Sequence, residues 1–203
     1  MAVYDSLARF YDQAFAPFER RFLARWRDET LAMLPHGSDI VEIGSGTGAN
    51  FSLYPPSRCS VSTEFSIKMI EIAATKTVGN HLVQADGQAL PFPDNSFDAA
   101  FATLVFCSIP DPHVAFREVK RIVRPGGRVV LLEHVRPEGM FGTAFDVLNV
   151  FTKAVIQDHF NRRTAEIAAN AGLMIREVRV KARGAVNLIV AEVPEPTLLE
   201  ANG

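Results

Sequence analysis

The sequence predicts an α/β protein built on a doubly wound sheet of seven strands, six parallel and one antiparallel. Short apolar runs rich in β-branched residues alternate with helix-like segments, as in parallel strands joined by crossover helices. A glycine-rich loop follows the first of these runs, beginning at Gly44. The chain ends in two alternating apolar and polar runs separated by Arg183 and Gly184, which predict a hairpin that supplies the antiparallel strand.

The composition indicates one ordinary globular domain over residues 1–203, since 48% of the residues are hydrophobic and 22% are charged. A net charge of −2 gives no general attraction for nucleic acid, so no nucleic-acid partner is expected. The two cysteines, Cys59 and Cys107, form no disulfide framework, which favours a reduced cytoplasmic protein. No signal peptide and no run of about 18 apolar residues is visible, so any membrane contact is expected to be peripheral.

The first half of the chain predicts a helical N-terminal segment followed by three strands. Apolar residues recur at spacings of three and four over residues 4–33, with Pro17 dividing the segment into two helices. Residues 50–54 form at most a brief helix before Pro55 and Pro56. The expected strands cover residues 38–43, 59–64 and 81–86. Ser66 is expected to cap a helix over residues 66–76.

The second half predicts the remaining strands of the sheet and the helices that cover it. Asp111 followed by Pro112 marks the start of a helix that ends before the Arg-Pro-Gly-Gly sequence at 124–127. Residues 141–172 are expected to be helical and to end at Gly172. The expected strands cover residues 97–106, 127–135, 173–182 and 185–193.

The loop in "VEIGSGTGANF" (residues 41–51) has the spacing G-x-G-x-G, with glycines at 44, 46 and 48. A dinucleotide site has the spacing G-x-G-x-x-G and holds a pyrophosphate at a helix N-terminus. S-adenosylmethionine (SAM) has no phosphate, and its ribose hydroxyls and amino groups require carboxylates instead. Glu42, Glu64 and Asp86 lie at the ends of the first three strands, where ligands bind in such sheets.

Each of these features also has a purely structural explanation. A single G-x-G could be a tight turn, Glu64 a polar strand end, and Asp86 a turn former before Gly87. Three acidic residues at successive strand ends beside one glycine loop favour SAM, and NAD remains the main competing ligand. No cluster of Asp or Asn follows the fourth strand, so no metal site is expected.

Four segments together resemble the class I SAM-dependent methyltransferases, over about residues 38–193. They are "VEIGSGTGANF", "TEFSIKMIEIA", "ADGQALPFPDNSFDAAFAT" and "REVKRIVRPGGRVVLLEHV". "LPFPDNSFD" and "RPGG" resemble the branch that contains the ubiquinone/menaquinone C-methyltransferases. The run from Ala102 to Val135, followed by "FNRRTAEIAANAG", is similar to small thiol S-methyltransferases, and bacterial phospholipid N-methyltransferases share this size and fold.

The resemblance implies a Rossmann-like methyltransferase fold and a SAM site, with S-adenosylhomocysteine as product. It divides the chain into an N-terminal helical lid (1–35), a SAM-binding core (38–135), an acceptor-side lid (136–160) and a final helix and hairpin (161–193). It implies contacts with the methionine part of SAM at Glu42, Gly44, Ser45, Gly46 and Gly48, and a ribose-binding acid at Glu64. It implies neighbours of the adenine at Phe65, Met69, Asp86 and Gly87, and residues that line the cofactor after the fourth strand at Thr103 and Leu104.

A protonated acceptor needs a base within reach of its proton. His134, at the end of the fifth strand, is the first candidate because histidine titrates near neutrality. His159 with Asp158 is the second, and each histidine could instead be structural. A thiol, with a pKa of about 8.5, could also react with little help from a base.

The acceptor is expected to be a lipophilic small molecule or a phospholipid. Six phenylalanines in the two lid segments favour an apolar pocket, although they could equally be core residues: Phe15, Phe18, Phe141, Phe145, Phe151 and Phe160. Tyr11 and Tyr4 could face a growing ammonium group by cation–π attraction. Arginines at 20, 21, 25 and 27 alternate with Phe22 and Trp26, as on a helix that contacts anionic lipid or on an ordinary surface helix.

Overall fold

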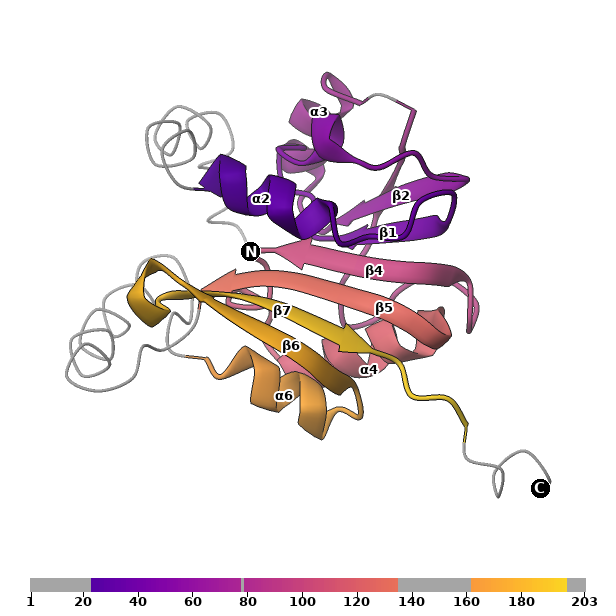
Figure 1. The fold of residues 1–203 in the computed structure, drawn as a ribbon. Coiled ribbons are helices and arrows are strands. Elements are labelled where there is room, and N and C mark those ends of the chain that lie inside the picture. Colours follow the sequence, from indigo (N-terminus) through magenta and orange to yellow (C-terminus); the bar gives the residue numbers. More distant parts are fainter. Residues whose placement is uncertain (1–22, 78, 135–161, 197–203) are drawn as a thin grey trace.

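The computed structural model describes residues 23–77, 79–134 and 162–196 of the chain. Within these residues, seven strands form one sheet in the order β3-β2-β1-β4-β5-β7-β6 (Figure 1). β7 runs opposite to the other six strands, so the expected six parallel strands and one antiparallel strand are confirmed. The strands are β1 (Asp39–Ile43), β2 (Cys59–Glu64), β3 (His81–Gln84), β4 (Phe97–Thr103), β5 (Val123–His134), β6 (Met174–Lys181) and β7 (Val186–Glu192).

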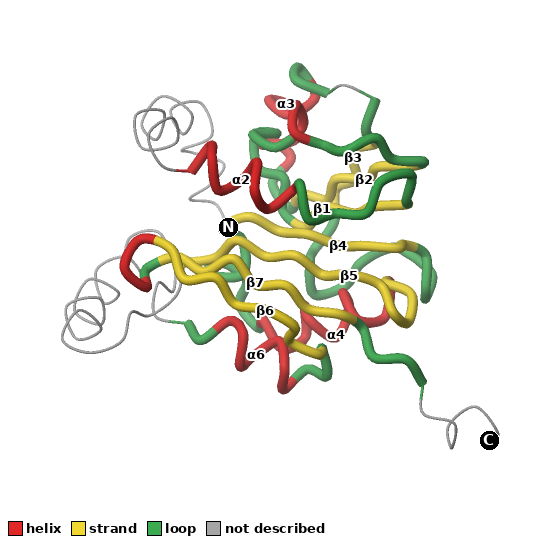
Figure 2. Tube along the Cα trace, viewed as in Figure 1, coloured by secondary structure: helices red, strands yellow, loops and turns green. Residues whose placement is uncertain are grey.

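Helices lie against the sheet and connect its strands (Figure 2). Asp111 begins α4 by accepting hydrogen bonds from the backbone N–H groups of His113 and Val114, and Ser66 caps α3 through the N–H of Met69. Both caps were expected from the sequence. The helices and 3-10 turns are α2 (Ala24–Leu31), η2 (Phe51–Leu53), α3 (Ile67–Ala74), α4 (Pro112–Ile122), α6 (Thr164–Asn170) and η3 (Ala182–Gly184).

The sheet has an apolar cluster on each face because successive side chains of a strand point to opposite sides. On one face, Phe116 and Val119 of α4 and Ala168 of α6 pack over residues such as Val41. On the other face, Leu31 of α2 packs with Phe101 and its neighbours. Val186, Leu188 and Val190 bring β7 into this second cluster.

Three strand boundaries differ by two residues or more from those expected. β3 ends at Gln84 rather than at Asp86, which instead forms the turn that follows. β4 ends at Thr103 rather than at Phe106, because Leu104 has a φ of +60° and the N–H groups of the next two residues bond to Glu133. β5 begins at Val123 rather than at Gly127, since Val123 already pairs with Phe97. The Arg-Pro-Gly-Gly sequence therefore lies within β5.

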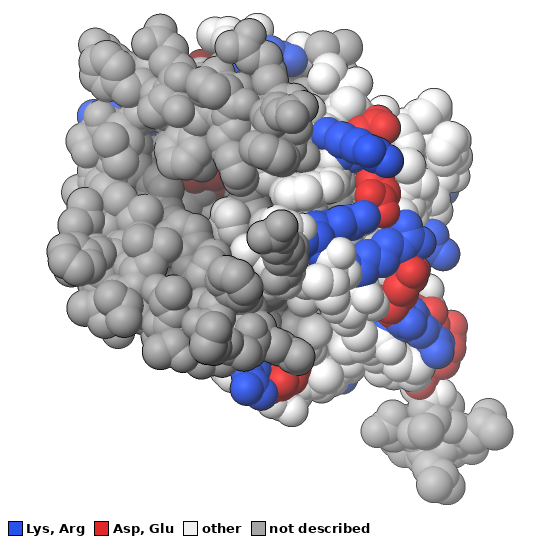
Figure 3. Space-filling model, turned by 60° about the vertical axis from the view of Figure 1, so that its left-hand side comes forward, with Lys and Arg blue, Asp and Glu red and all other residues white. Residues whose placement is uncertain are grey.

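Opposite charges lie beside one another on the surface. On the face drawn in Figure 3, Lys and Arg side chains alternate with Asp and Glu side chains. Ion pairs of this kind join Arg179 to Glu29 and Glu177, and Arg176 to Glu192. Within the described part of the chain, no helix is long and apolar enough to cross a bilayer.

Candidate cofactor site

The loop after β1 brings its backbone close to open space. Gly44 and Gly46 have φ values of +69° and +54°, which residues with a Cβ rarely adopt. A Cβ on Gly44 would lie 2.5 Å from Cγ1 of Val105, whereas a Cβ on Gly46 would have no atom within 4 Å. Gly44 is therefore needed for packing, and Gly46 leaves a position at which a ligand can approach the backbone.

Glu64, the last residue of β2, holds this loop through its carboxylate. One oxygen accepts the N–H of Gly46 at 2.9 Å and the other accepts the N–H of Ser66 at 2.8 Å. An ionised carboxylate can accept hydrogen bonds at about four positions, so these two bonds are compatible with further donors such as ribose hydroxyls. The residue expected to bind a ribose thus also fixes the glycine loop.

Asp86 and Gly87 form the turn after β3. The Asp86 carboxylate accepts the N–H of Gln88 at 2.9 Å and contacts the amide nitrogen of its side chain at 3.2 Å. Gly87 lies close to the β4–α4 loop, since a Cβ there would be 3.3 Å from Cδ1 of Ile109. The carboxylates of Glu64, at the end of β2, and of Asp86, just after β3, therefore follow the two strands that lie on one side of β1 and its glycine loop.

The remaining expected cofactor neighbours differ in exposure. Phe65 is 43% exposed, so its ring is accessible to a ligand, whereas Met69 is buried on α3. Ser45 is also buried, and its hydroxyl has no hydrogen-bond partner within the described part of the chain. A buried hydroxyl without a partner is unusual in a native structure, and a polar ligand group would satisfy it.

Glu42 is fully buried and is the centre of a polar network beneath the glycine loop. Its carboxylate accepts hydrogen bonds from the side chains of Asn50 and Tyr54, and the Tyr54 hydroxyl also lies 2.8 Å from that of Ser62. Burial raises the pKa of Glu42, while the bonds from Tyr54 and Asn50 and the charge of Arg27 oppose that shift. Burial likewise raises the pKa of Tyr54, so its phenol remains protonated and donates.

Arg27 joins α2 to this network and was not expected there. Its side chain is 9% exposed and donates to Asn50 at 3.0 Å and to the hydroxyl of Thr103. The interpretation of the basic residues of this segment as one surface face is therefore wrong for Arg27, whereas Arg25 is exposed. A buried arginine so far from its partners in the sequence leaves no local signal, because only the fold brings them together.

Thr103 and Leu104 lie where β4 ends, at the same edge of the sheet as the glycine loop. Thr103 accepts a hydrogen bond from Asn50 at 2.9 Å as well as the one from Arg27. Leu104 has the strained φ of +60° and donates its N–H to the Leu132 carbonyl at 2.7 Å. Strained backbone of this kind is concentrated at functional sites.

His134 is the last residue of β5 and is half-buried. Side-chain alternation places it on the α2 face of the sheet, like Leu132. Burial lowers the pKa of His134, against the effect of a hydrogen bond with the Ala185 backbone. The imidazole is thus neutral near pH 7, the form that can accept a proton. His159, Asp158 and Tyr11 lie outside the described residues, as do the six lid phenylalanines.

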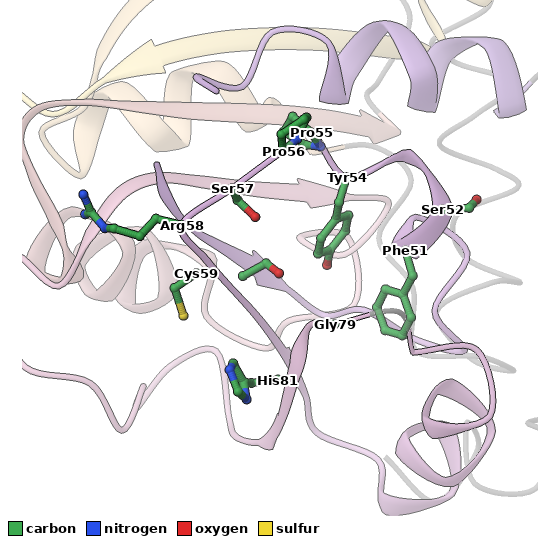
Figure 4. A pocket seen from close by; sticks show the side chains of 11 residues that line it. Phe51, Ser52, Tyr54, Pro55, Pro56, Ser57, Arg58, Cys59, Gly79 and His81 are labelled. Atoms are coloured by element: carbon green, nitrogen blue, oxygen red, sulfur yellow. The ribbon is translucent and has the colours of Figure 1, made fainter. Parts of the chain in front are cut away.

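A hollow of about 630 Å³ lies at the amino-terminal end of β2. Figure 4 shows Cys59 and His81 at the first residues of β2 and β3, with Tyr54 and Phe51 on the other side of the hollow. Ligands of open α/β sheets bind at the carboxyl ends of the strands, so this hollow is not the expected cofactor site.

Residues 41–131 match a family model described as a methyltransferase domain. Among curated proteins, the chain is 31% identical to the demethylmenaquinone methyltransferase of Bacillus licheniformis over 150 residues, which are 69% of this chain and 64% of that protein. It is 38% identical to the human thiol S-methyltransferase TMT1B over 104 residues, 47% of this chain and 42% of that protein. The chain belongs to the class I SAM-dependent methyltransferases. It spans less than two thirds of the length of these relatives.

Solved structures agree on the fold. A SAM-dependent methyltransferase of Thermotoga maritima superposes with a TM-score of 0.73 at 22% identity, covering 95% of this chain and 98% of that one. The cyclase SpnF superposes with a TM-score of 0.68 at 18% identity, covering 86% and 80%. The same fold therefore serves a protein named for another reaction, and the activity of this methyltransferase must be argued from its site.

SAM is the cofactor of this family, and the site fits its chemistry. The open side of Gly46, the buried hydroxyl of Ser45, and the carboxylates of Glu64 and Asp86 suit a ligand with an amino-acid end, ribose hydroxyls and an adenine amine. No phosphate is required by this set of groups.

Proposed function

We propose that this methyltransferase transfers a methyl group from SAM to a lipophilic small molecule, with a thiol as the first acceptor to test. The observation that supports the transfer is the open backbone at Gly46 together with the carboxylates of Glu64 and Asp86, which follow the neighbouring strands β2 and β3. SAM supplies a methyl group already activated by a sulfonium. The protein must therefore mainly position the acceptor and exclude water.

His134 is the proposed base. The acceptor's S–H proton moves to the imidazole, and the resulting thiolate forms a bond to the methyl carbon. The bond between that carbon and the sulfonium sulfur breaks, its electron pair stays on the sulfur, and S-adenosylhomocysteine is the product. The lowered pKa of His134 supports this role, since a neutral ring is available at physiological pH.

A quinone is the second candidate acceptor. The likeness to demethylmenaquinone methyltransferases extends over 150 residues, whereas the likeness to the human thiol S-methyltransferase covers 104. The longer match, to the demethylmenaquinone methyltransferase, supports a quinone ring as the acceptor. The higher identity, to the human thiol S-methyltransferase, supports a thiol as the acceptor. A phospholipid amine remains the third acceptor, with membrane contact through the N-terminal segment.

The test is transfer of labelled methyl from SAM to three acceptors assayed side by side: an alkyl or aryl thiol, a demethyl-quinol, and vesicles of phosphatidylethanolamine. We expect label on the thiol. Label on the quinol alone would move the assignment to carbon methylation, and label on the vesicles alone would favour the phospholipid. SAM binding with label on none of them would contradict the proposed acceptors and favour a SAM-binding partner subunit.

A further inference from the structure

The loop between β4 and α4 (residues 104–110) supports both parts of the expected cofactor site. Val105 occupies the space beside Gly44, where a Cβ would be only 2.5 Å from the valine methyl. Ile109 lies against Gly87, 3.3 Å from the position of a Cβ there. A shift of this loop would therefore move the backing of the glycine loop and of the turn after Asp86 together.

Glu133 holds the β4–α4 loop by accepting hydrogen bonds from the loop's N–H groups. This fully buried carboxylate, next to the end of β5, accepts the N–H of Val105 at 3.0 Å and that of Phe106 at 3.1 Å. The ring of Phe106 also stacks on Phe116 of α4, with 3.9 Å between the ring centroids. These contacts keep Leu104 in its strained conformation, which a free loop would leave.

Arg162 holds the same loop by donating hydrogen bonds to the loop's carbonyl groups. One guanidinium nitrogen donates to the carbonyl of Phe106 and to that of Ile109, the second at 2.7 Å. Arg162 directly follows residues 135–161, the stretch that contains the expected acceptor-side lid. The chain that leaves this segment is therefore bonded to the loop that supports the cofactor site.

We propose that Arg162 is a positioning residue that sets SAM affinity by fixing the β4–α4 loop, an inference that rests on the proposed function. Phe106 is buried, and a carbonyl there that loses its charged donor must find another partner or move. Because Val105 and Ile109 touch Gly44 and Gly87, that movement reaches both cofactor contacts. Arg162, the first described residue after 135–161, therefore acts on the same loop as both cofactor contacts.

The experiment compares SAM dissociation constants by calorimetry for the native protein, Arg162→Gln and Arg162→Lys, at a temperature well below every melting temperature. We expect Arg162→Gln to weaken SAM binding about tenfold or more, a usual size for coupled sites. Lysine keeps the charge but lacks the planar fork, so Arg162→Lys should fall between the two. It also serves as the test variant if Arg162→Gln does not fold.

Two control variants separate positioning from general loss of stability. Arg163→Gln removes the next arginine, which is exposed, immediately precedes α6 and pairs with Glu166 of that helix. Arg124→Gln removes an arginine that bonds to the Ser96 carbonyl and to Asp98 at the opposite edge of the sheet. Both should retain native SAM affinity even where the melting temperature falls.

Native affinity in both Arg162 variants would overturn the inference, as would an equal loss of affinity in Arg124→Gln. A native protein that does not bind SAM at all would instead overturn the proposed function, and the role of Arg162 with it. The two failures are thus distinguishable.

Discussion

Gly46 should separate cofactor binding from stability at a single residue. In Gly46→Ala the new methyl group meets no atom within 4 Å, so the cost to folding is the strain of φ +54°, about 1–2 kcal/mol. The methyl group would stand in the space assigned to SAM, and we expect SAM affinity to fall at least tenfold. Chemical denaturation and calorimetry measure the two effects.

Gly37→Ala is the matched control, because Gly37 has a φ of +68° and equally open surroundings but lies before β1. It should carry the same strain and leave SAM affinity unchanged. Unchanged affinity in Gly46→Ala would remove Gly46 from the cofactor site.

The sequence predicts well those site residues whose role follows from backbone position. Glu64 ends β2 and Asp86 lies two residues after β3, and parallel strands bring their carboxyl ends together on one side of the sheet. Arg27 and Tyr54 could not be placed in this way. Their partners are Thr103 and Glu42, and only the packing of α2 and η2 on the sheet brings these side chains together.

At the scale of elements, α2 is anchored to the far edge of the sheet by Glu29. Its carboxylate accepts bonds of 2.8–2.9 Å from the Lys181 ammonium and one of 3.1 Å from Arg179, both on β6. The bond from Lys181, followed by the weaker effect of Arg179, lowers the pKa of Glu29 against partial burial. Because these groups are about a third exposed, Glu29→Gln should cost less than about 1 kcal/mol at pH 7.

The pH dependence of that cost has a definite sign. A carboxyl whose pKa is lowered on folding stabilises the native state above its ordinary pKa of 4.5, and loses this contribution as the pH falls through the lowered value. Urea denaturation should therefore show a difference between native protein and Glu29→Gln that is full at pH 7 and shrinks below about pH 4.5. Glu166→Gln is the control, because its partner Arg163 is exposed and immediately precedes the same helix. A difference that is constant with pH would mean that the ion pairs contribute nothing.

The bounds of helices and strands could be predicted where residues close in sequence determine them, and less well where long-range contacts determine them. β2 has the expected bounds, and the caps at Ser66 and Asp111 begin helices as expected. The end of β4 depends on Glu133, a residue 30 positions after Thr103, which takes N–H groups that a longer strand would have used. The sequence of residues 97–106 alone does not indicate that Glu133 takes these N–H groups from the strand.

At the scale of the whole molecule, the strand order puts the site at the topological switch point of the sheet, where successive strands begin to be added on the other side of β1. β1 lies in the middle of the sheet, with β2 and β3 on one side and β4 and β5 on the other. The connections that leave β1 and β4 therefore separate at their carboxyl ends and form the crevice in which ligands of such sheets bind. Bound SAM would contact both halves of the sheet, through Glu64 on β2 and Thr103 on β4.

SAM should therefore stabilise the entire fold. A ligand that binds only the native state at 100 times its dissociation constant adds about 2.7 kcal/mol, which for a chain of this size raises the melting temperature by about 5–10 °C. NAD at the same concentration should cause no shift, because the G-x-G-x-G loop lacks the spacing of a dinucleotide site. Thermal denaturation with each ligand, repeated on Gly46→Ala, makes the measurement. An equal shift with NAD, or a full SAM shift in Gly46→Ala, would contradict this assignment of the crevice. A shift with SAM alone that disappears in the variant would tie the stability of the sheet to the backbone that Gly46 leaves open.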